Sequence, residues 1–87
     1  MSYTVLWTPK AQAALSQIWQ DLDDPATLLR SLRLIDLALS RDPLHVGESR
    51  EEDVRIGFEN PIGVEFRVDE ERQTVFVLTI SENWRTQ

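Results

Sequence analysis

Residues 54–80 read VRIGFENPIGVEFRVDEERQTVFVLTI, and this stretch decides the fold. Apolar side chains alternate with others in three segments, which are separated by short polar breaks near Asn60 and at residues 69–73. Alternation with a period of two is typical of β-strands, and breaks as short as these join antiparallel neighbours. The stretch therefore predicts a three-stranded antiparallel meander.

The residues that precede the meander carry the signals of one strand and two helices. Residues 3–7 are rich in β-formers, and Thr8-Pro9 then supplies an N-cap hydroxyl and a proline at the first helical position. Asp24-Pro25 repeats the device, and Asp42-Pro43 ends the second helix because a residue before proline disfavours helical backbone. The apolar positions at helical spacing are Ala11, Ala14, Leu15, Ile18, Trp19 and Leu22 in the first helix and Leu28, Leu29, Leu32, Ile35 and Leu39 in the second.

The order strand, helix, helix, strand, strand, strand predicts an α+β fold, in which a helical hairpin packs on one face of a mainly antiparallel four-stranded sheet. The pattern leaves the place of the first strand in the sheet open. Residues 42–53 are expected to form an ordered surface loop. Residues 1–87 suffice for one hydrophobic core, so we expect a single domain.

The register of the meander decides which side chains face away from the helices. Directly opposed side chains share a face, and keeping the apolar residues together requires Phe58 opposite Ile62 and Val68 opposite Thr74. The expected core face consists of Val54, Ile56, Phe58, Ile62, Val64, Phe66, Phe76, Leu78 and Ile80. The expected open face has Asp53 opposite Arg67 and Arg55 opposite Glu65, with Val75 and Val77 beside them.

Composition narrows the class of protein. Hydrophobic residues make up 41% and charged residues 28% of the chain, which is typical of a folded globular protein. No apolar run approaches the roughly 20 residues that cross a bilayer, and no secretory signal is visible, so we expect a cytoplasmic protein without a membrane partner. With no cysteine and a single histidine, His45, the chain predicts no disulfide, no metal site and no cofactor.

The charge balance bears on the kind of ligand. Nine basic residues against 15 acidic ones give a net charge of -6, and an acidic surface repels a polyanion at long range. Nucleic acid is therefore disfavoured as the main ligand. Arg55 and Arg67 suit phosphate or carboxylate recognition, but Glu65 and Asp53 could neutralise them as cross-strand pairs. Both interpretations stay open.

The run 75–80, VFVLTI, reads as a strand that is buried on both faces. Val75 and Val77 would then line a docking groove for a partner segment, or else be covered by the chain's own loop or tail. Trp84 would extend such a patch, or pack against the end of a helix. The first interpretation predicts a protein-binding face.

Several stretches together resemble the RelE/ParE superfamily of bacterial toxin–antitoxin toxins, also called plasmid stabilisation proteins. They are WTPKA at 7–11, GESR at 47–50 and VEFRVDEERQTVFVLTI at 64–80, in this order around the two helices. The resemblance spans nearly the entire chain. It implies a small cytoplasmic toxin that is neutralised by an antitoxin, whose extended or helical segment wraps around it.

The resemblance implies two modes of action. RelE-type members are ribonucleases that cut ribosome-bound mRNA with basic residues, whereas ParE-like members act by binding DNA gyrase. The ribonuclease mode would assign catalysis to Arg50, Arg55, Arg67 and Arg85. The third strand opens with PIGV at 61–64, where an arginine is common in the ribonucleases, and this departure favours action through protein–protein contact.

The predicted antitoxin site lies on the open sheet face. It consists of Arg55, Glu65, Arg67, Val75, Val77 and Trp84. An alternative is a non-toxic homodimer that buries the same face against its own copy.

Overall fold

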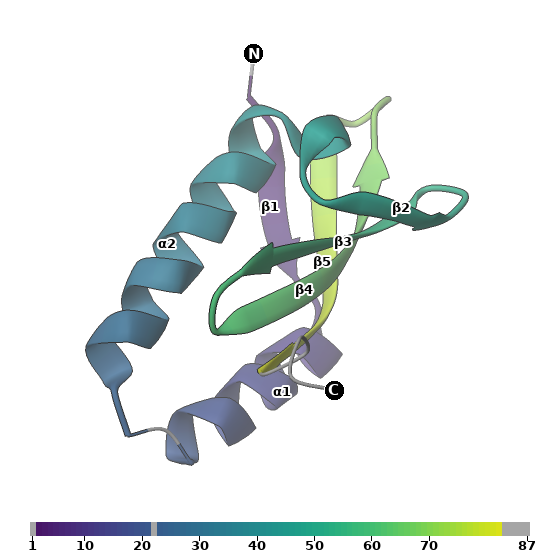
Figure 1. Cartoon of the computed structure of the whole chain (residues 1–87). Coiled ribbons are helices and arrows are strands. Elements are labelled where there is room, and N and C mark those ends of the chain that lie inside the picture. The colour runs from purple at the N-terminus through teal and green to yellow at the C-terminus, as the bar shows by residue number, and fades with distance from the viewer. Residues whose placement is uncertain (1, 22, 83–87) are drawn as a thin grey trace.

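The computed structural model describes residues 2–21 and 23–82 (Figure 1). The elements in chain order are β1 (Thr4–Trp7), α1 (Pro9–Gln20), α2 (Pro25–Arg41), the 3-10 helix η1 (Pro43–His45), β2 (Glu48–Glu51), β3 (Val54–Glu59), β4 (Ile62–Asp69) and β5 (Thr74–Glu82). The sheet has the order β1-β5-β4-β3-β2, and only the β1–β5 pair is parallel. The predicted α+β class, with two helices on a mainly antiparallel sheet, is confirmed, but the sheet has five strands.

Both helices begin where their capping residues predict. The Thr8 hydroxyl oxygen accepts a hydrogen bond of 3.2 Å from the Ala11 amide, and the Asp24 carboxylate accepts one of 3.2 Å from the Thr27 amide. In each case a proline occupies the first helical position, where no amide hydrogen is needed. The second helix ends at Arg41, one residue before Asp42-Pro43, as predicted.

The first strand lies at the edge of the sheet, beside β5. Its parallel register places Val5 next to Val75 and Trp7 next to Val77. The Thr8 hydroxyl donates to the Val77 carbonyl oxygen at 2.8 Å, so the N-cap of α1 also anchors the end of β1 to β5. This contact fixes where α1 starts on the sheet.

The expected loop over 42–53 is wrong, because it contains η1 and the added edge strand β2. Gly47 turns the chain between them with a φ of 61°, in the left-handed region that favours glycine. A Cβ atom at Gly47 would lie 1.8 Å from the Ile56 carbonyl oxygen, so only glycine lets the backbone approach β3 this closely. All four residues of β2 are exposed, and an exposed strand has no apolar alternation by which its sequence could reveal it.

The predicted register of the meander is also wrong, by one residue at the β3–β4 turn. Ile62 pairs with Glu59, and Phe58 pairs with Gly63. Because side chains alternate between faces, this shift places Phe58 on the open face, where it is 38% exposed. Gly57 takes the position that faces α2, and a Cβ atom there would lie 2.8 Å from Val46 Cγ1.

The predicted register at the β4–β5 turn is wrong by one residue as well, because Val68 pairs with Val75 and not with Thr74. A bulge in β5 then adds a second shift. Phe66 pairs with Val77 while Glu65 pairs with Thr79, so Leu78 is an extra residue on β5. Val75 and Val77 therefore share the core face with Ile80, although strict alternation cannot place all three together. Both valines are 0% exposed.

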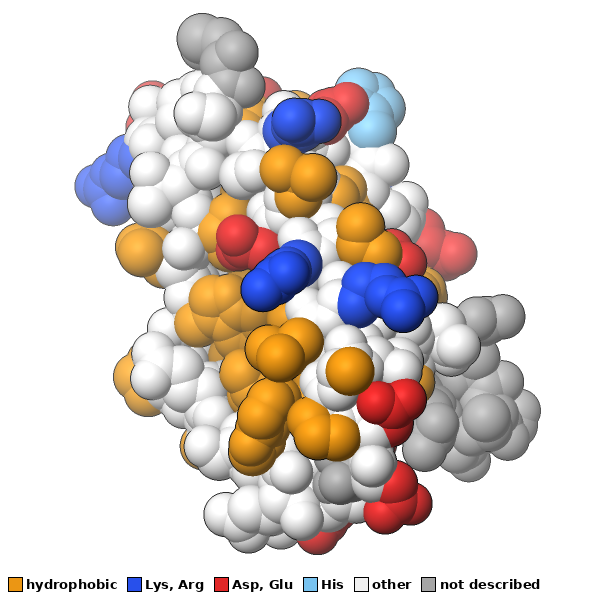
Figure 2. Space-filling model, turned by 90° about the vertical axis from the view of Figure 1, so that its left-hand side faces the viewer, with side chains coloured by type: hydrophobic (Ala, Val, Ile, Leu, Met, Phe, Trp, Pro, Cys, Tyr) orange, Lys and Arg blue, Asp and Glu red, His pale blue; other side chains and the backbone are white. Residues whose placement is uncertain are grey.

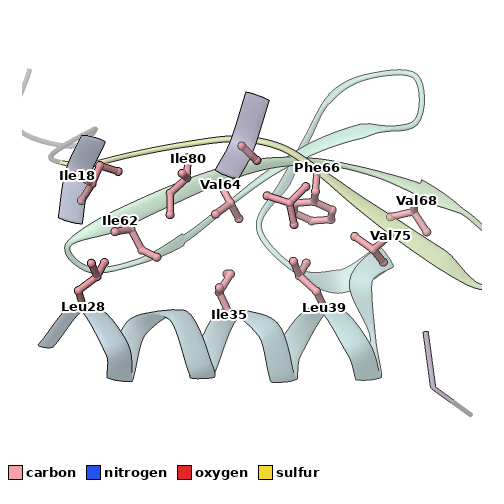
Figure 3. Packing of buried hydrophobic residues seen from close by; sticks show 12 residues of the cluster. Ile18, Leu28, Ile35, Leu39, Ile62, Val64, Phe66, Val68, Val75 and Ile80 are labelled. Atoms are coloured by element: carbon pink, nitrogen blue, oxygen red, sulfur yellow. The ribbon is translucent and has the colours of Figure 1, made fainter. Parts of the chain in front are cut away.

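The hydrophobic core lies between the helices and this face of the sheet (Figure 3). Leu28, Ile35 and Leu39 point from α2 toward the strand side chains in that view. The buried cluster consists of Ala11, Ile18, Leu28, Ile35, Leu39, Ile62, Val64, Phe66, Val68, Val75, Val77 and Ile80.

Candidate functional site: an apolar groove between the helices

The structure separates the residues of the predicted antitoxin site. Val75 and Val77 are sealed in the core, so neither is available on the surface. Arg55 pairs in register with Phe66, which places its side chain on the helix side of the sheet and not on the open face. Trp84 and Arg85 lie outside the described residues. Of this set, Glu65 and Arg67 are the described members on the open face.

Arg55 holds the backbone that precedes β2. Its Nε donates to the Val46 carbonyl oxygen at 3.0 Å, and its terminal nitrogen donates to the Gly47 carbonyl oxygen at 3.0 Å. The predicted Arg55–Glu65 pair is therefore wrong. Glu65 instead forms an ion pair with Arg50 from β2, with 3.4 Å between Arg50 Nε and the carboxylate oxygen.

The predicted ion pair of Arg67 with Asp53 is confirmed, with 3.6 Å between Arg67 Nε and the Asp53 carboxylate, but Val54 and not Asp53 lies opposite Arg67 in the strand register. Thus Arg50 and Arg67 each have a carboxylate partner, and Arg55 is engaged on the other side of the sheet. Of the arginines that a ribonuclease would require, Arg55 is therefore separated by the sheet from Arg50 and Arg67.

The groove that the structure does form lies between the two helices and has a volume of about 760 Å³. It exists because α1 packs on β5 whereas α2 packs on β3 and β1, so the helices diverge from the short link that joins them (Figure 1). The apolar lining residues are Trp7, Leu15, Trp19, Leu29 and Leu32, and the polar ones are Gln12, Ser16, Gln20, Arg33 and Asp36.

Large apolar side chains remain open to solvent in this groove. Trp19 from α1 is 46% exposed and Leu29 from α2 is 45% exposed, and they lie on opposite walls. Figure 2 views the molecule from the side on which α2 lies in Figure 1 and shows hydrophobic side chains gathered in one patch next to Lys and Arg side chains. Exposed apolar surface of this kind marks a site of protein or ligand contact.

Sequence reasoning placed Leu15, Trp19, Leu29 and Leu32 on buried helix faces but did not find the groove. The periodicity identifies the apolar stripe of each helix, but it gives no angle between the helices. One feature of the sequence could have indicated the groove, namely the width of the apolar stripe on α2. Leu29 and Leu32 flank the residues that the sheet covers, so the stripe is wider than one sheet contact needs.

A metal centre and a membrane-spanning helix are two other kinds of functional element. No group of three or more His, Asp or Glu side chains in residues 2–21 and 23–82 is placed to hold a metal ion. No helix among these residues has the length and hydropathy of a membrane span.

The element order, the sheet topology and the two helices define a domain with the RelE/ParE fold. No protein-family model matches the sequence, and no curated protein matches it. Solved structures, in contrast, do match this chain.

The toxin–antitoxin complex RelBE2 from Mycobacterium tuberculosis matches with 25% identity and a TM-score of 0.79, over 94% of this chain and 92% of that chain. The chromosomal ParDE system of P. aeruginosa matches with 24% identity and a TM-score of 0.70, over 92% and 95%. The isolated E. coli RelE toxin matches with 16% identity and a TM-score of 0.58, over 95% and 86%. The resemblance to the RelE/ParE superfamily is confirmed, and the isolated RelE toxin shares the fold.

Proposed function

We propose that this chain is the toxin or toxin-like component of a cytoplasmic toxin–antitoxin module, that it acts through protein–protein contact, and that an antitoxin neutralises it. The structural neighbours support this role, because they include the RelBE2 and ParDE toxin–antitoxin systems. The observation that carries the proposal is the open apolar groove between α1 and α2.

The antitoxin docks in this groove. Burying the exposed area of Trp19 and Leu29 removes apolar surface from water at about 25 cal/mol per Å², and tryptophan is a frequent anchor of protein interfaces. The polar rim of the groove consists of Gln12 and Gln20 on the α1 side and Arg33 and Asp36 on the α2 side. Apolar walls with a polar rim suit an amphipathic segment that inserts large side chains between the helices.

Contact with a target protein is favoured over cleavage of RNA. Phosphodiester cleavage requires positive charge at the developing phosphorane. On the open face of the sheet, Arg50 and Arg67 are paired with Glu65 and Asp53, and the chain as a whole has a net charge of -6. The proposed cellular target of the toxin is therefore a protein such as DNA gyrase, and the alternative target is the ribosome with its mRNA.

Induced expression tests the proposal. The chain is expressed alone and together with the product of the adjacent reading frame, and growth is followed with mRNA integrity. We expect growth arrest that the neighbour relieves, and arrest that persists with intact mRNA in the Arg50→Ala, Arg67→Ala double variant. Arrest that disappears in this variant, together with cleaved mRNA in the unchanged protein, would establish the ribonuclease mode. Normal growth without any complex with the neighbour would remove the proposed module.

A further inference from the structure

The outer face of α2 carries two exposed leucines between two arginines. Arg30, Leu34, Leu37 and Arg41 follow one another at i, i+4, i+7 and i+11, so they lie along a single face of the helix over about 16 Å. Leu34 is 44% exposed and Leu37 is 46% exposed, and both arginines are exposed. We call this set the outer face of α2.

The orientation of the outer face is fixed by what the opposite face of α2 contacts. Leu28, Ile35 and Leu39 are buried against the sheet, and the Ser31 hydroxyl donates to the Asn60 carbonyl oxygen at 2.8 Å. Because the hydrogen bond and the core contacts hold the helix from one side, it cannot rotate to bury Leu34 and Leu37. The two leucines are therefore presented to solvent in the isolated chain.

The arginines of this face differ in their partners from three arginines at the sheet and its β4–β5 turn. Arg50 and Arg67 on the sheet and Arg72 in the β4–β5 turn each lie within 4.0 Å of a carboxylate. In the described part of the chain, Arg30 and Arg41 have no carboxylate at that distance. A protein with a net charge of -6 thus keeps guanidinium groups without a direct ion pair on either side of an exposed leucine pair, although Arg30 is near enough to Asp24 to contribute to the lowered pKa of that carboxyl.

We propose that the outer face of α2 binds an acidic amphipathic helix of a partner protein. The leucines contact the apolar stripe of that helix, and its carboxylates pair with Arg30 and Arg41 at the two ends. Guanidinium groups are well suited to carboxylates because both are planar and can form two parallel hydrogen bonds. The surface is separate from the groove, whose α2 wall is formed by Leu29, Leu32, Arg33 and Asp36.

The charges disfavour the other occupants of such a face. A second copy docked across a two-fold axis would place this arginine-bearing face against itself, so like charges would meet. A nucleic acid or an anionic membrane is repelled at long range by the net charge of -6, and two leucines offer little area for insertion into lipid. An acidic polypeptide of low charge density is repelled less strongly than these polyanions, and its carboxylates can meet Arg30 and Arg41 directly.

A synthetic helix tests the proposal without requiring a known partner. The probe is a labelled peptide of about 18 residues with leucines at i, i+3, i+4 and i+7 and glutamates on both flanks, and the counter-probe replaces each glutamate by lysine. Binding is measured by fluorescence anisotropy on the full chain. The variant is Arg30→Glu with Arg41→Glu, and the matched control is Lys10→Glu with Arg72→Glu; both change the net charge from -6 to -10.

We expect the glutamate peptide to bind the unchanged chain and the control with equal affinity. Its affinity should fall about tenfold for the α2 variant, and also for a second variant that carries Leu34→Ser and Leu37→Ser. The lysine peptide is expected to bind the unchanged chain more weakly than the glutamate peptide does, and to gain affinity on the α2 variant. Equal loss in the control, equal binding of both peptides or no binding of the glutamate peptide would overturn the proposal. It would also be overturned if single-stranded RNA or phosphatidylglycerol vesicles bound through Arg30 and Arg41 more tightly than the peptide, or if sedimentation showed a dimer that the α2 variant dissociates.

Discussion

Arg55 Nε donates a hydrogen bond of 3.0 Å to the carbonyl oxygen of Val46. The guanidinium also reaches the Gly47 carbonyl oxygen at 3.0 Å, so one side chain of β3 secures the backbone that leads into β2. Arg55 thus stabilises the edge of the sheet, and its position does not fit a role in binding an RNA phosphate on the open face.

Replacing Arg55 by alanine should destabilise the protein by about 1–2 kcal/mol, because two charge-assisted hydrogen bonds to backbone carbonyls are lost. Hydrogen exchange should rise over Glu48–Glu51, whose pairing with β3 begins just after the held segment. Arg72→Ala serves as the control, since the Arg72 side chain is 80% exposed in a surface ion pair of small value. Unchanged exchange in β2 would contradict the structural role of Arg55.

Val77→Ala should cost about 2 kcal/mol of unfolding free energy, because two methyl groups leave a fully buried site beside Phe66. Leu44→Ala, at an exposed leucine, is expected to change stability by less than about 0.5 kcal/mol. Urea unfolding followed by circular dichroism measures both. Equal, small effects would show that Val77 faces solvent, as the register predicted from sequence requires.

Gly47→Ala should destabilise the protein by roughly 2 kcal/mol, because the added Cβ atom meets the Ile56 carbonyl oxygen and the backbone has a positive φ. The loss is expected to appear first as faster hydrogen exchange in β2. Ser49→Ala, at an exposed position of the same strand, is the comparison and should leave the exchange pattern intact. A variant at Gly47 as stable as the unchanged chain would rule out this close approach.

Asp24 gives a prediction for pH. The hydrogen bond from the Thr27 hydroxyl, followed by that from the Thr27 amide, lowers the pKa of the Asp24 carboxyl below its ordinary value of 3.8. A carboxyl whose pKa is lowered by folding stabilises the folded state above the unfolded value, and the contribution is lost as the pH falls through the folded value. The extra stability of the unchanged chain over Asp24→Asn should therefore be constant near neutral pH and shrink below about pH 3.8.

The difference in stability between the unchanged chain and Asp24→Asn is measured from the midpoints of urea unfolding between about pH 7 and about pH 3. Asp23→Asn is the neighbouring control, since its carboxylate makes neither of the two hydrogen bonds to Thr27. A difference that grows on acidification would have the wrong sign for a lowered pKa.

The helices were predictable from sequence because their signals are local. Thr8-Pro9 and Asp24-Pro25 fix both starts through bonds to backbone amides three residues on, and neither depends on distant parts of the chain. The strands from residue 54 onward were predictable for the same reason, since alternation identifies a strand without its neighbour. The RelE/ParE resemblance followed from this order of elements.

The register and the site were not predictable, because they depend on contacts between elements. The bulge at Leu78 lets odd and even positions of β5 share one face, and nothing in the run from Val75 to Ile80 marks the extra residue. Val75 and Val77 were assigned to the wrong face because they pair with Val68 and Phe66, one residue away from the predicted register, and the bulge then returns Ile80 to that same face. The groove depends on the angle between α1 and α2, which hydrophobic periodicity does not encode.

The central claim is that a partner of the toxin–antitoxin type docks in the groove, and its most direct test is the affinity of the purified chain for the product of the adjacent reading frame. Calorimetry on the unchanged chain, on Trp19→Glu, on Leu29→Glu and on the control Leu44→Glu provides the comparison, because Leu44 is an exposed leucine outside the groove. We predict that each groove variant weakens binding by about 30-fold or more while the control binds as tightly as the unchanged chain. Undiminished binding by both groove variants would contradict the account.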